Sequence, residues 1–321
     1  MVARTMPSRT AIIKMIRFAV TLALLALLWQ AVDGPAALDL LLASDARWLV
    51  AAVVVLTGQT LLSALRWRLT AGALGHAIPV GRALREYYLS QIVNQSLPGG
   101  VLGDASRAVR ARHEAGLKRA GQAVVFERLA GQLVLFAVTA IAVLMVWATP
   151  GGMVLPEWVL RLVAFSGLTI AVIAGLIWGF SHGAGIASRH VRDWINAFSL
   201  SVFAPAVVPR QILLSLGTTA LNLLAFALCA RATGTTMPLT AVMIVVPLIL
   251  FTMLIPISVS GWGLREGAAA ALFPVFGATA TEGFAASLAF GLMFLLSTMP
   301  GVVVLLISPK PVPVETGSIS G

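Results

Sequence analysis

The sequence predicts an all-α membrane protein that crosses the bilayer several times. Of its 321 residues, 59% are hydrophobic and only 11% are charged. Several apolar runs approach the length of about 20 residues that a helix needs to cross a bilayer. Runs such as FAVTLALLALLW and LVLFAVTAIAVLMVW are continuous, whereas the strands of a membrane β-barrel alternate lipid-facing and lumen-facing residues. The composition therefore excludes both a soluble domain and a barrel.

The positions of the basic residues indicate how the chain crosses the membrane. The net charge of +10 would suggest nucleic acid as the partner of a soluble protein, but in a membrane protein Lys and Arg collect on the cytoplasmic side. Residues 1–17 carry four cations and no acid, and the apolar run 18–32 follows. We interpret this run as a first span and expect no nucleic acid partner. A cleaved signal peptide would look similar, but the run is long for one and no convincing cleavage site follows it.

Five further full spans are expected, and segment 80–118 is not among them. This segment carries too many cations to cross lipid, where each costs about 3 kcal/mol, so we expect it to be cytoplasmic or re-entrant. After the fourth span, apolar residues recur at helical spacing over 191–198, which predicts an amphipathic helix at the interface. The further spans cover about residues 48–65, 127–148, 162–180, 211–230 and 284–307.

These spans form a single membrane domain over residues 1–308, followed by a flexible tail at 309–321. All but four of the 22 Lys and Arg then lie on the cytoplasmic side together with both termini, whereas the 12 acids divide evenly. A bias carried by cations alone is what the positive-inside rule describes. Seven tryptophans, including Trp67 and Trp262, fall near the ends of spans, which is typical of aromatic belts.

Two stretches rich in Pro and Gly interrupt this pattern, NQSLPGGVLGDASRAVRAR at 94–112 and PISVSGWGLREG at 256–267. In each, an arginine follows a proline by nine residues and has an acid nearby. The units around them, 48–148 and 211–307, both consist of a span, a broken pair and a span, in opposite orientations. This predicts an inverted repeat with two re-entrant helical hairpins, as in transporters. If the run 239–257 instead crosses the membrane fully, the second hairpin is lost and the helical bundle remains.

The broken stretches also carry the candidate chemistry. A helix that stops and restarts leaves carbonyl and amide groups unpaired, and at membrane depth these must face protein or water. Free amides beside an arginine suit a phosphate group. Polar residues at 87, 91, 94 and 95 give the preceding helix a polar face toward the same place. The residues expected to shape the hairpins are Pro98, Gly99, Gly100, Gly103, Pro256, Gly261 and Gly263.

Each adjacent acid and arginine pair permits two interpretations. Glu127 and Arg128 could reach the interface together, or Glu127 could neutralise an arginine of the first hairpin. The pair Arg265 and Glu266 permits the same alternatives, but it lies between two apolar pieces, where a partner or a water-filled site is needed more. The more distal cations Arg110, Arg112, Lys118 and Arg119 are expected to contact anionic lipid, and Thr218, Thr219 and Asn222 to serve helix packing.

No motif for catalysis or cofactor binding is found. The sequence has no Walker loop, no dinucleotide fingerprint, no nucleophile elbow and no metal-ligand cluster. We therefore expect no enzyme, no cofactor and no ATP hydrolysis. The lone cysteine, Cys229, lies in an apolar run and is expected to be a packing residue.

The string NQSLPGGVLGDASRAVR, followed by FERLAGQ and later by PISVSGWGLREGA, resembles the membrane region of the lysylphosphatidylglycerol synthase/flippase family. It is similar to the flippase half of the bacterial multiple peptide resistance protein and to hopanoid-associated and archaeal relatives, over roughly residues 15–308. The resemblance implies a protein of the bacterial inner membrane that moves a lipid or lipid-linked headgroup between leaflets. The sequence given ends at Gly321 without an aminoacyl-transferase domain, so synthesis of lysyl-lipid is not implied and the cargo stays open.

We therefore predict a lipid flippase without its own ATPase, whose partners are membrane lipids with an anionic or phosphate-bearing headgroup. Arg107 and Arg265 are expected to bind phosphate, while the acids pair with them or take up protons. Alternatives are a membrane-embedded transferase, an accessory subunit that recruits a separate lipid-modifying enzyme, and a small-solute permease. The residues expected to bind substrate are Asn94, Asp104, Arg107, Glu127, Arg128, Arg265 and Glu266.

Overall fold

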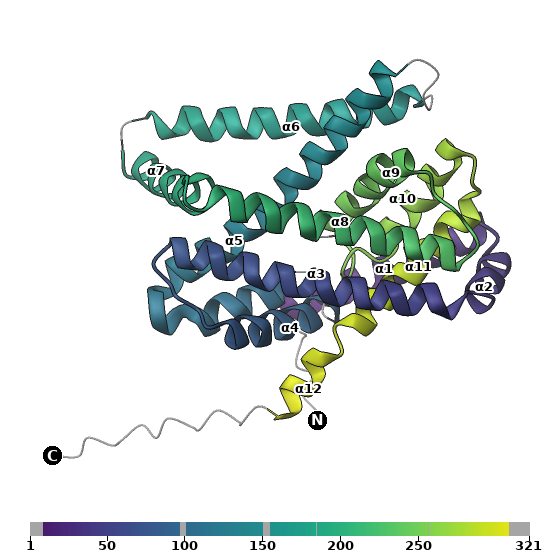
Figure 1. Cartoon of the computed structure of the whole chain (residues 1–321), viewed down its shortest axis with the longest axis horizontal. Helices are drawn as coiled ribbons and strands as arrows, with labels where there is room; N and C mark the ends of the chain where they lie inside the picture. Colours follow the sequence, from purple (N-terminus) through teal and green to yellow (C-terminus); the bar gives the residue numbers. More distant parts are fainter. Residues whose placement is uncertain (1–8, 97–100, 150–154, 184, 256, 308–321) are drawn as a thin grey trace, which may run out of the picture.

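The fold is a bundle of helices, shown in Figure 1. The computed structural model describes residues 9–96, 101–149, 155–183, 185–255 and 257–307, and within these residues there is no strand. The prediction of an all-α membrane protein is confirmed. The α-helices are α1 Arg9–Ala31, α2 Gly34–Leu42, α3 Ala46–Ala73, α4 Val80–Ser96, α5 Leu102–Ala148, α6 Glu157–Ser181, α7 Ile186–Phe198, α8 Val208–Ala232, α9 Leu239–Phe251, α10 Leu264–Leu272, α11 Ala280–Ser297 and α12 Pro300–Ile307.

Five helices in the described part of the chain are long and apolar enough to cross a membrane. They are α3, α5 from Gly116 onward, α6, α8, and α11 continued to Val304. They coincide with five predicted spans. The sixth predicted span corresponds to α1, which is followed by α2 after a bend of 94°. The segment between the predicted spans 18–32 and 48–65 thus contains a helix that the sequence did not predict. Asp33 adopts a left-handed backbone and caps α2 by accepting a hydrogen bond from the amide of Ala36.

The centre of the bundle is the antiparallel pair α3 and α8, which lie side by side in Figure 1. The amide of Asp45 before α3 donates to the carbonyl of Ala232 at the end of α8, at 3.0 Å. One apolar core surrounds Phe226, where α8, α9, α10 and α11 meet. A second core forms around Trp67 and Phe126, where α4 and the first part of α5 cover α3.

The two predicted broken stretches fall at real interruptions of helices. The first separates α4 from α5, and α5 itself breaks at Gly116, which has a positive φ of 79°. The second separates α9 from α10. With 13 residues, α9 rises only about 20 Å, less than the hydrocarbon thickness of about 30 Å, so α9 alone does not cross. The inverted repeat stays a prediction.

Helices α6 and α7 flank the bundle. In Figure 1, α6 lies along one edge of the molecule, and most of its side chains are exposed, as a lipid-facing helix requires. The predicted amphipathic helix is present as α7. Its Trp194 and the following Phe198 pack against Phe126 of α5, with ring centroids 5.6 and 5.2 Å apart. Part of the apolar face of α7 therefore packs against α5.

Candidate functional site

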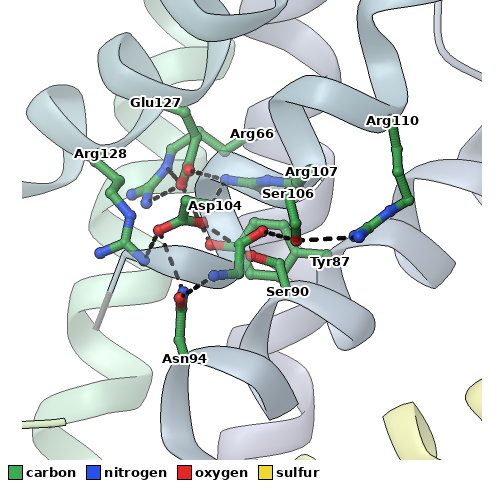
Figure 2. Close-up of polar contacts among 11 residues, drawn as sticks. Arg66, Tyr87, Ser90, Asn94, Asp104, Ser106, Arg107, Arg110, Glu127 and Arg128 are labelled. Atoms are coloured by element: carbon green, nitrogen blue, oxygen red, sulfur yellow. Dashed lines mark hydrogen bonds and ion pairs between the residues drawn. The ribbon is translucent and has the colours of Figure 1, made fainter. Parts of the chain in front are cut away.

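A buried ion cluster joins α3 and α5 (Figure 2). At its centre, Oε1 of Glu127 accepts hydrogen bonds from Nη2 of Arg66 at 2.6 Å and from Nε of Arg66 at 3.1 Å. Oε2 of Glu127 lies 3.4 Å from Nη2 of Arg107. Nη1 of Arg66 also donates to the hydroxyl of Thr218 on α8 at 2.9 Å. The carboxylate of Glu127 therefore pairs with arginines of α3 and α5, and Arg66 extends this network to α8.

Asp104 forms the second acidic centre of the cluster. It accepts hydrogen bonds from Ser90 at 3.0 Å and Asn94 at 3.2 Å on α4. It also pairs with Arg107 at 3.1 Å and with Arg128. The cluster thus contains three arginines and two carboxylates, and its net charge is one positive. Its members other than Arg128 are almost fully buried, where a charge without a partner would be strongly destabilising.

The tight contact between α4 and α5 depends on a glycine. Amide groups in the first turn of a helix have no partner within the helix, and Oδ1 of Asn94 accepts the hydrogen bond from the amide of Gly103 at 2.7 Å. A side chain at position 103 would overlap the backbone carbonyl of Ser90. Glycine at this position therefore permits the polar end of α4 to reach Asp104.

Arg107 lies between two aromatic rings. Its guanidinium carbon is 4.5 Å from the ring centroids of both Trp67 and Tyr87, a distance at which the aromatic faces stabilise the cation. Trp67 is 1% exposed, so our assignment of this tryptophan to an aromatic belt at the membrane surface is wrong. Its ring instead covers a buried arginine.

A cavity of about 240 Å³ lies beside the cluster. Arg66, Asp104, Glu127 and Arg128 line it, whereas Arg107 lies behind it and is fully buried. Amide and hydroxyl groups from α3, α4 and α8 form much of the remaining wall. They include Gln59, Gln91, Gln95, Thr218, Thr219 and Asn222.

The rim of the cavity combines a cation with apolar side chains. The side chain of Arg128 is 45% exposed, and Leu254, which follows α9, is 50% exposed. Leu135 of α5 and Leu250 of α9 continue the apolar wall inward. At this rim a ligand with a polar and an apolar part would find both surfaces.

The cluster lies near one end of two spanning helices. Arg66 comes 20 residues after the start of α3, and Glu127 comes 21 residues before the end of α5. At 1.5 Å per residue, each is about 30 Å from those ends, close to the hydrocarbon thickness of a bilayer. With those two helix ends at one surface of the membrane, the cavity lies near the opposite surface.

The second acid and arginine pair is sealed from the cavity. Arg265 and Glu266 bond each other at 2.5 Å, and both side chains are at most 1% exposed. Ser287 of α11 bonds both residues at 3.1 Å. The guanidinium of Arg265 lies 5.4 Å from the ring centroid of Phe290, and Phe290 itself lines the cavity.

The structure brings most of the predicted site residues of the first half together. Asn94, Asp104, Glu127 and Arg128 line the cavity. Of the two interpretations of Glu127, the structure supports its pairing with an arginine of the first hairpin. The two stretches also touch, since Ser260 donates a hydrogen bond to Gln95. Among the predicted hairpin residues, Pro98, Gly99, Gly100 and Pro256 lie outside the described residues.

The sequence interpretation missed Arg66 and Thr218. Arg66, which directly follows the predicted span 48–65, was counted only among the cytoplasmic cations, and Thr218 was expected to serve helix packing. Both residues line the cavity and bond each other. A signal was available, because Gln59, Ser63 and Arg66 follow one another at steps of four and three residues. This spacing places them on one face of a helix. A polar face within an apolar run indicates a polar interior surface.

Comparison with known proteins identifies the family. The sequence matches the family described as lysylphosphatidylglycerol synthase TM region over residues 14–301. The chain belongs to this family. The match includes every side chain of the cluster and the cavity. The resemblance noted from the three sequence motifs is thereby confirmed.

A curated relative of this lysylphosphatidylglycerol synthase TM region protein comes from Methanothermobacter thermautotrophicus (strain Delta H) and is named UPF0104 membrane protein. It is 28% identical over 260 residues, which cover 71% of this chain and 73% of the relative. No solved structure matches the chain significantly. The family places the protein among lipid-related membrane proteins.

Proposed function

We propose that this family member is a flippase, which moves a phospholipid or another lipid-linked polar headgroup between the leaflets of the bacterial inner membrane. The observation that carries the proposal is the cavity of about 240 Å³, with a charged interior and a rim that combines Arg128 with apolar side chains. A soluble ligand does not need an apolar surface such as the exposed Leu254 in the lining of the cavity, whereas a lipid does. In this arrangement both termini lie in the cytoplasm, as the cation distribution predicts.

Arg128 is the residue that we assign to the phosphate. It lies at the rim, is the most exposed arginine of the cluster, and pairs with Asp104. A guanidinium can bind two phosphate oxygens at once. Arg66 contributes a second positive charge deeper in the wall.

Arg107 and Arg265, which the sequence suggested as phosphate ligands, are assigned a different role. Both are at most 1% exposed and neither lines the cavity. Arg107 neutralises Asp104 and Glu127 from behind. Arg265 neutralises Glu266 beneath Phe290. We propose that both arginines keep the cavity wall in shape.

Translocation in reconstituted vesicles tests the proposal. Acyl-labelled fluorescent phospholipids are incorporated in both leaflets, and a membrane-impermeant reductant quenches those of the outer leaflet. Vesicles with the protein should lose the protected signal of the inner leaflet. Arg128→Gln should lower the initial rate by about tenfold or more, because a hydrogen bond between charged groups contributes about 1.5 to 3 kcal/mol.

Arg161→Gln is the matched control. Arg161 is also paired with a carboxylate, that of Glu157, but its side chain is 79% exposed and lies on α6, away from the cavity. This variant should transport at the wild-type rate. Equal rates for Arg128→Gln and Arg161→Gln would refute the assignment of the phosphate to Arg128. Protection of the inner leaflet in wild-type vesicles, with a new lipid species detected by mass spectrometry, would instead favour a transferase.

A further inference from the structure

A second, smaller cavity lies between α5, α8 and the connection from α7 to α8. Its volume of about 90 Å³ corresponds to the liquid volume of about three water molecules. Among the described residues that line it, only Gln211 and Ser215 of α8 have polar side chains, and none is charged. It shares no lining residue with the cavity beside the ion cluster. The two cavities are therefore separate sites.

The polar groups of this second cavity lie at its inner end. Gln211 and Ser215 are at most 3% exposed, whereas the lining residues Leu133, Phe203 and Ile212 are at least 39% exposed. Helix α8 is long and apolar enough to cross a membrane. Gln211 comes three residues after its first residue, or about 5 Å along the helix axis. The mouth of the cavity is thus apolar and opens toward lipid close to one membrane surface.

The polar atoms at the inner end have no partner within the protein. Both the amide nitrogen and the amide oxygen of Gln211, and the hydroxyl of Ser215, lack a hydrogen bond within the part of the chain that the structure describes. The same two residue types occur at the same spacing on α3, where the amide of Gln59 donates to Ser63 at 3.0 Å. On α8 this bond is absent. Since buried polar groups are normally hydrogen-bonded, a bound molecule is expected to supply the partners.

The unpaired atoms restrict the chemistry of that molecule. The oxygen of Gln211 only accepts and its nitrogen only donates, so the bound group must both donate and accept. A carboxylate, a phosphate diester and an ester carbonyl only accept. An ammonium group only donates, and its charge would find no compensating side chain among the described lining residues. A hydroxyl group donates, accepts, carries no charge and fits the small volume.

The mouth of the cavity indicates what carries the hydroxyl. Water also donates and accepts, but the exposed Leu133, Phe203 and Ile212 face hydrocarbon, where water is scarce. A hydrocarbon chain attached to the hydroxyl would cover these side chains. We propose that the second cavity binds an uncharged lipid alcohol, whose hydroxyl bonds Gln211 and Ser215. This lipid is a bound ligand and not the cargo, because its site is separate from the proposed translocation cavity.

Two lipids that differ in one group test the proposal. They are 1,2-dioleoylglycerol, which has a free hydroxyl, and its 3-O-methyl ether, which has none. Native mass spectrometry of the detergent-solubilised full chain measures the affinity for each lipid. Dioleoylglycerol should bind about tenfold more tightly than the ether, because the ether cannot donate a hydrogen bond to Gln211 and leaves its buried oxygen unpaired.

Variants of α8 locate the binding. Gln211→Met keeps the size of the side chain and removes its polar atoms, so it should abolish the tenfold difference between the two lipids. Ser215→Ala, a smaller change, should narrow the difference. Gln122→Met is the matched control, since Gln122 is a buried glutamine of α5 that lines neither cavity. This control should keep the tenfold difference.

Thermal unfolding shows whether a loss of binding reflects the site or the fold. Without added lipid, Gln211→Met should unfold at the wild-type Tm, because the amide that it replaces bonds no other described residue. A lower Tm would mean that the amide is already satisfied without a lipid, and would overturn the proposal.

The lipid measurements can also refute the proposal. Equal affinities of the wild type for both lipids, or no binding of either, would overturn it and would indicate that water fills the cavity. A tenfold preference that persists in both Gln211→Met and Ser215→Ala would place the lipid elsewhere. Binding is measured without translocation, so failure of the flippase proposal in the vesicle assay leaves these results unchanged.

Discussion

Replacing Glu127 by Gln tests the ion cluster directly. The amide keeps the shape of the side chain but removes the charge that Arg66 and Arg107 share. Glu127 is 1% exposed, so both guanidinium groups remain buried, and the net charge of the cluster rises from one positive to two. Removing one partner of a buried ion pair costs about 3 to 5 kcal/mol of the free energy of unfolding.

Thermal unfolding in detergent, followed by circular dichroism, measures this loss. In a chain of more than 150 residues, 1 kcal/mol shifts the Tm by about 2 °C, so the Tm should fall by roughly 6 to 10 °C. Glu157→Gln is the matched control, because its pair with Arg161 is exposed on both sides and exposed pairs contribute little. A fall in Tm no larger than that of the control would refute our view that Glu127 compensates two buried arginines.

Two further predictions concern residues close to α4, one on α5 and one in the segment before α4. Gly103→Ala should lower the Tm, because the new methyl group overlaps a carbonyl of α4. Gly121→Ala on α5 is the control and should not lower the Tm, because a methyl group at this position meets no neighbour. Equal Tm values for both variants would contradict the close contact between α4 and α5 at Gly103. Burial, and to a smaller extent the charge of Arg82, lower the pKa of His76 from its ordinary value of 6.5. The unfolded chain then binds a proton that the folded protein does not, so the free energy of unfolding should fall as the pH drops from about 6.5 toward the lowered pKa. Denaturant titrations at several pH values should show that the free energy of unfolding depends on pH more steeply in the wild type than in His76→Gln. An equal pH dependence in both proteins would contradict the assignment of this effect to His76.

The spans could be predicted because their signal is local. A run such as residues 211–230 is long and apolar whatever surrounds it, and the observed α8 extends it by only a few residues at each end. The helix α2 was missed because its nine residues are too few to cross a membrane. Its start depends on the backbone of Asp33, which hydropathy does not reveal.

The site could be predicted only in part, because its contacts are distant in sequence. Asn94, Asp104 and Arg107 lie within one stretch, where Pro and Gly indicate an interruption. Arg66 ends an apolar run next to further cations, so its charge was interpreted as a topological signal. Its partner Glu127 is 61 residues away, and only the packing of α3 against α5 brings the two side chains together.

That separation has a consequence for how the protein enters the membrane. Chains are synthesised at about 5 to 20 residues per second, so Arg66 leaves the ribosome roughly 3 to 12 s before Glu127. During this interval Arg66 lacks the carboxylate with which it pairs in the folded protein, and burying it in lipid alone would be unfavourable. The C-terminal end of α3 should therefore wait at the membrane surface or within the insertion machinery until α5 has been made. The ion cluster thus links the insertion of α3 to the synthesis of α5, and both helices contribute to the wall of the cavity.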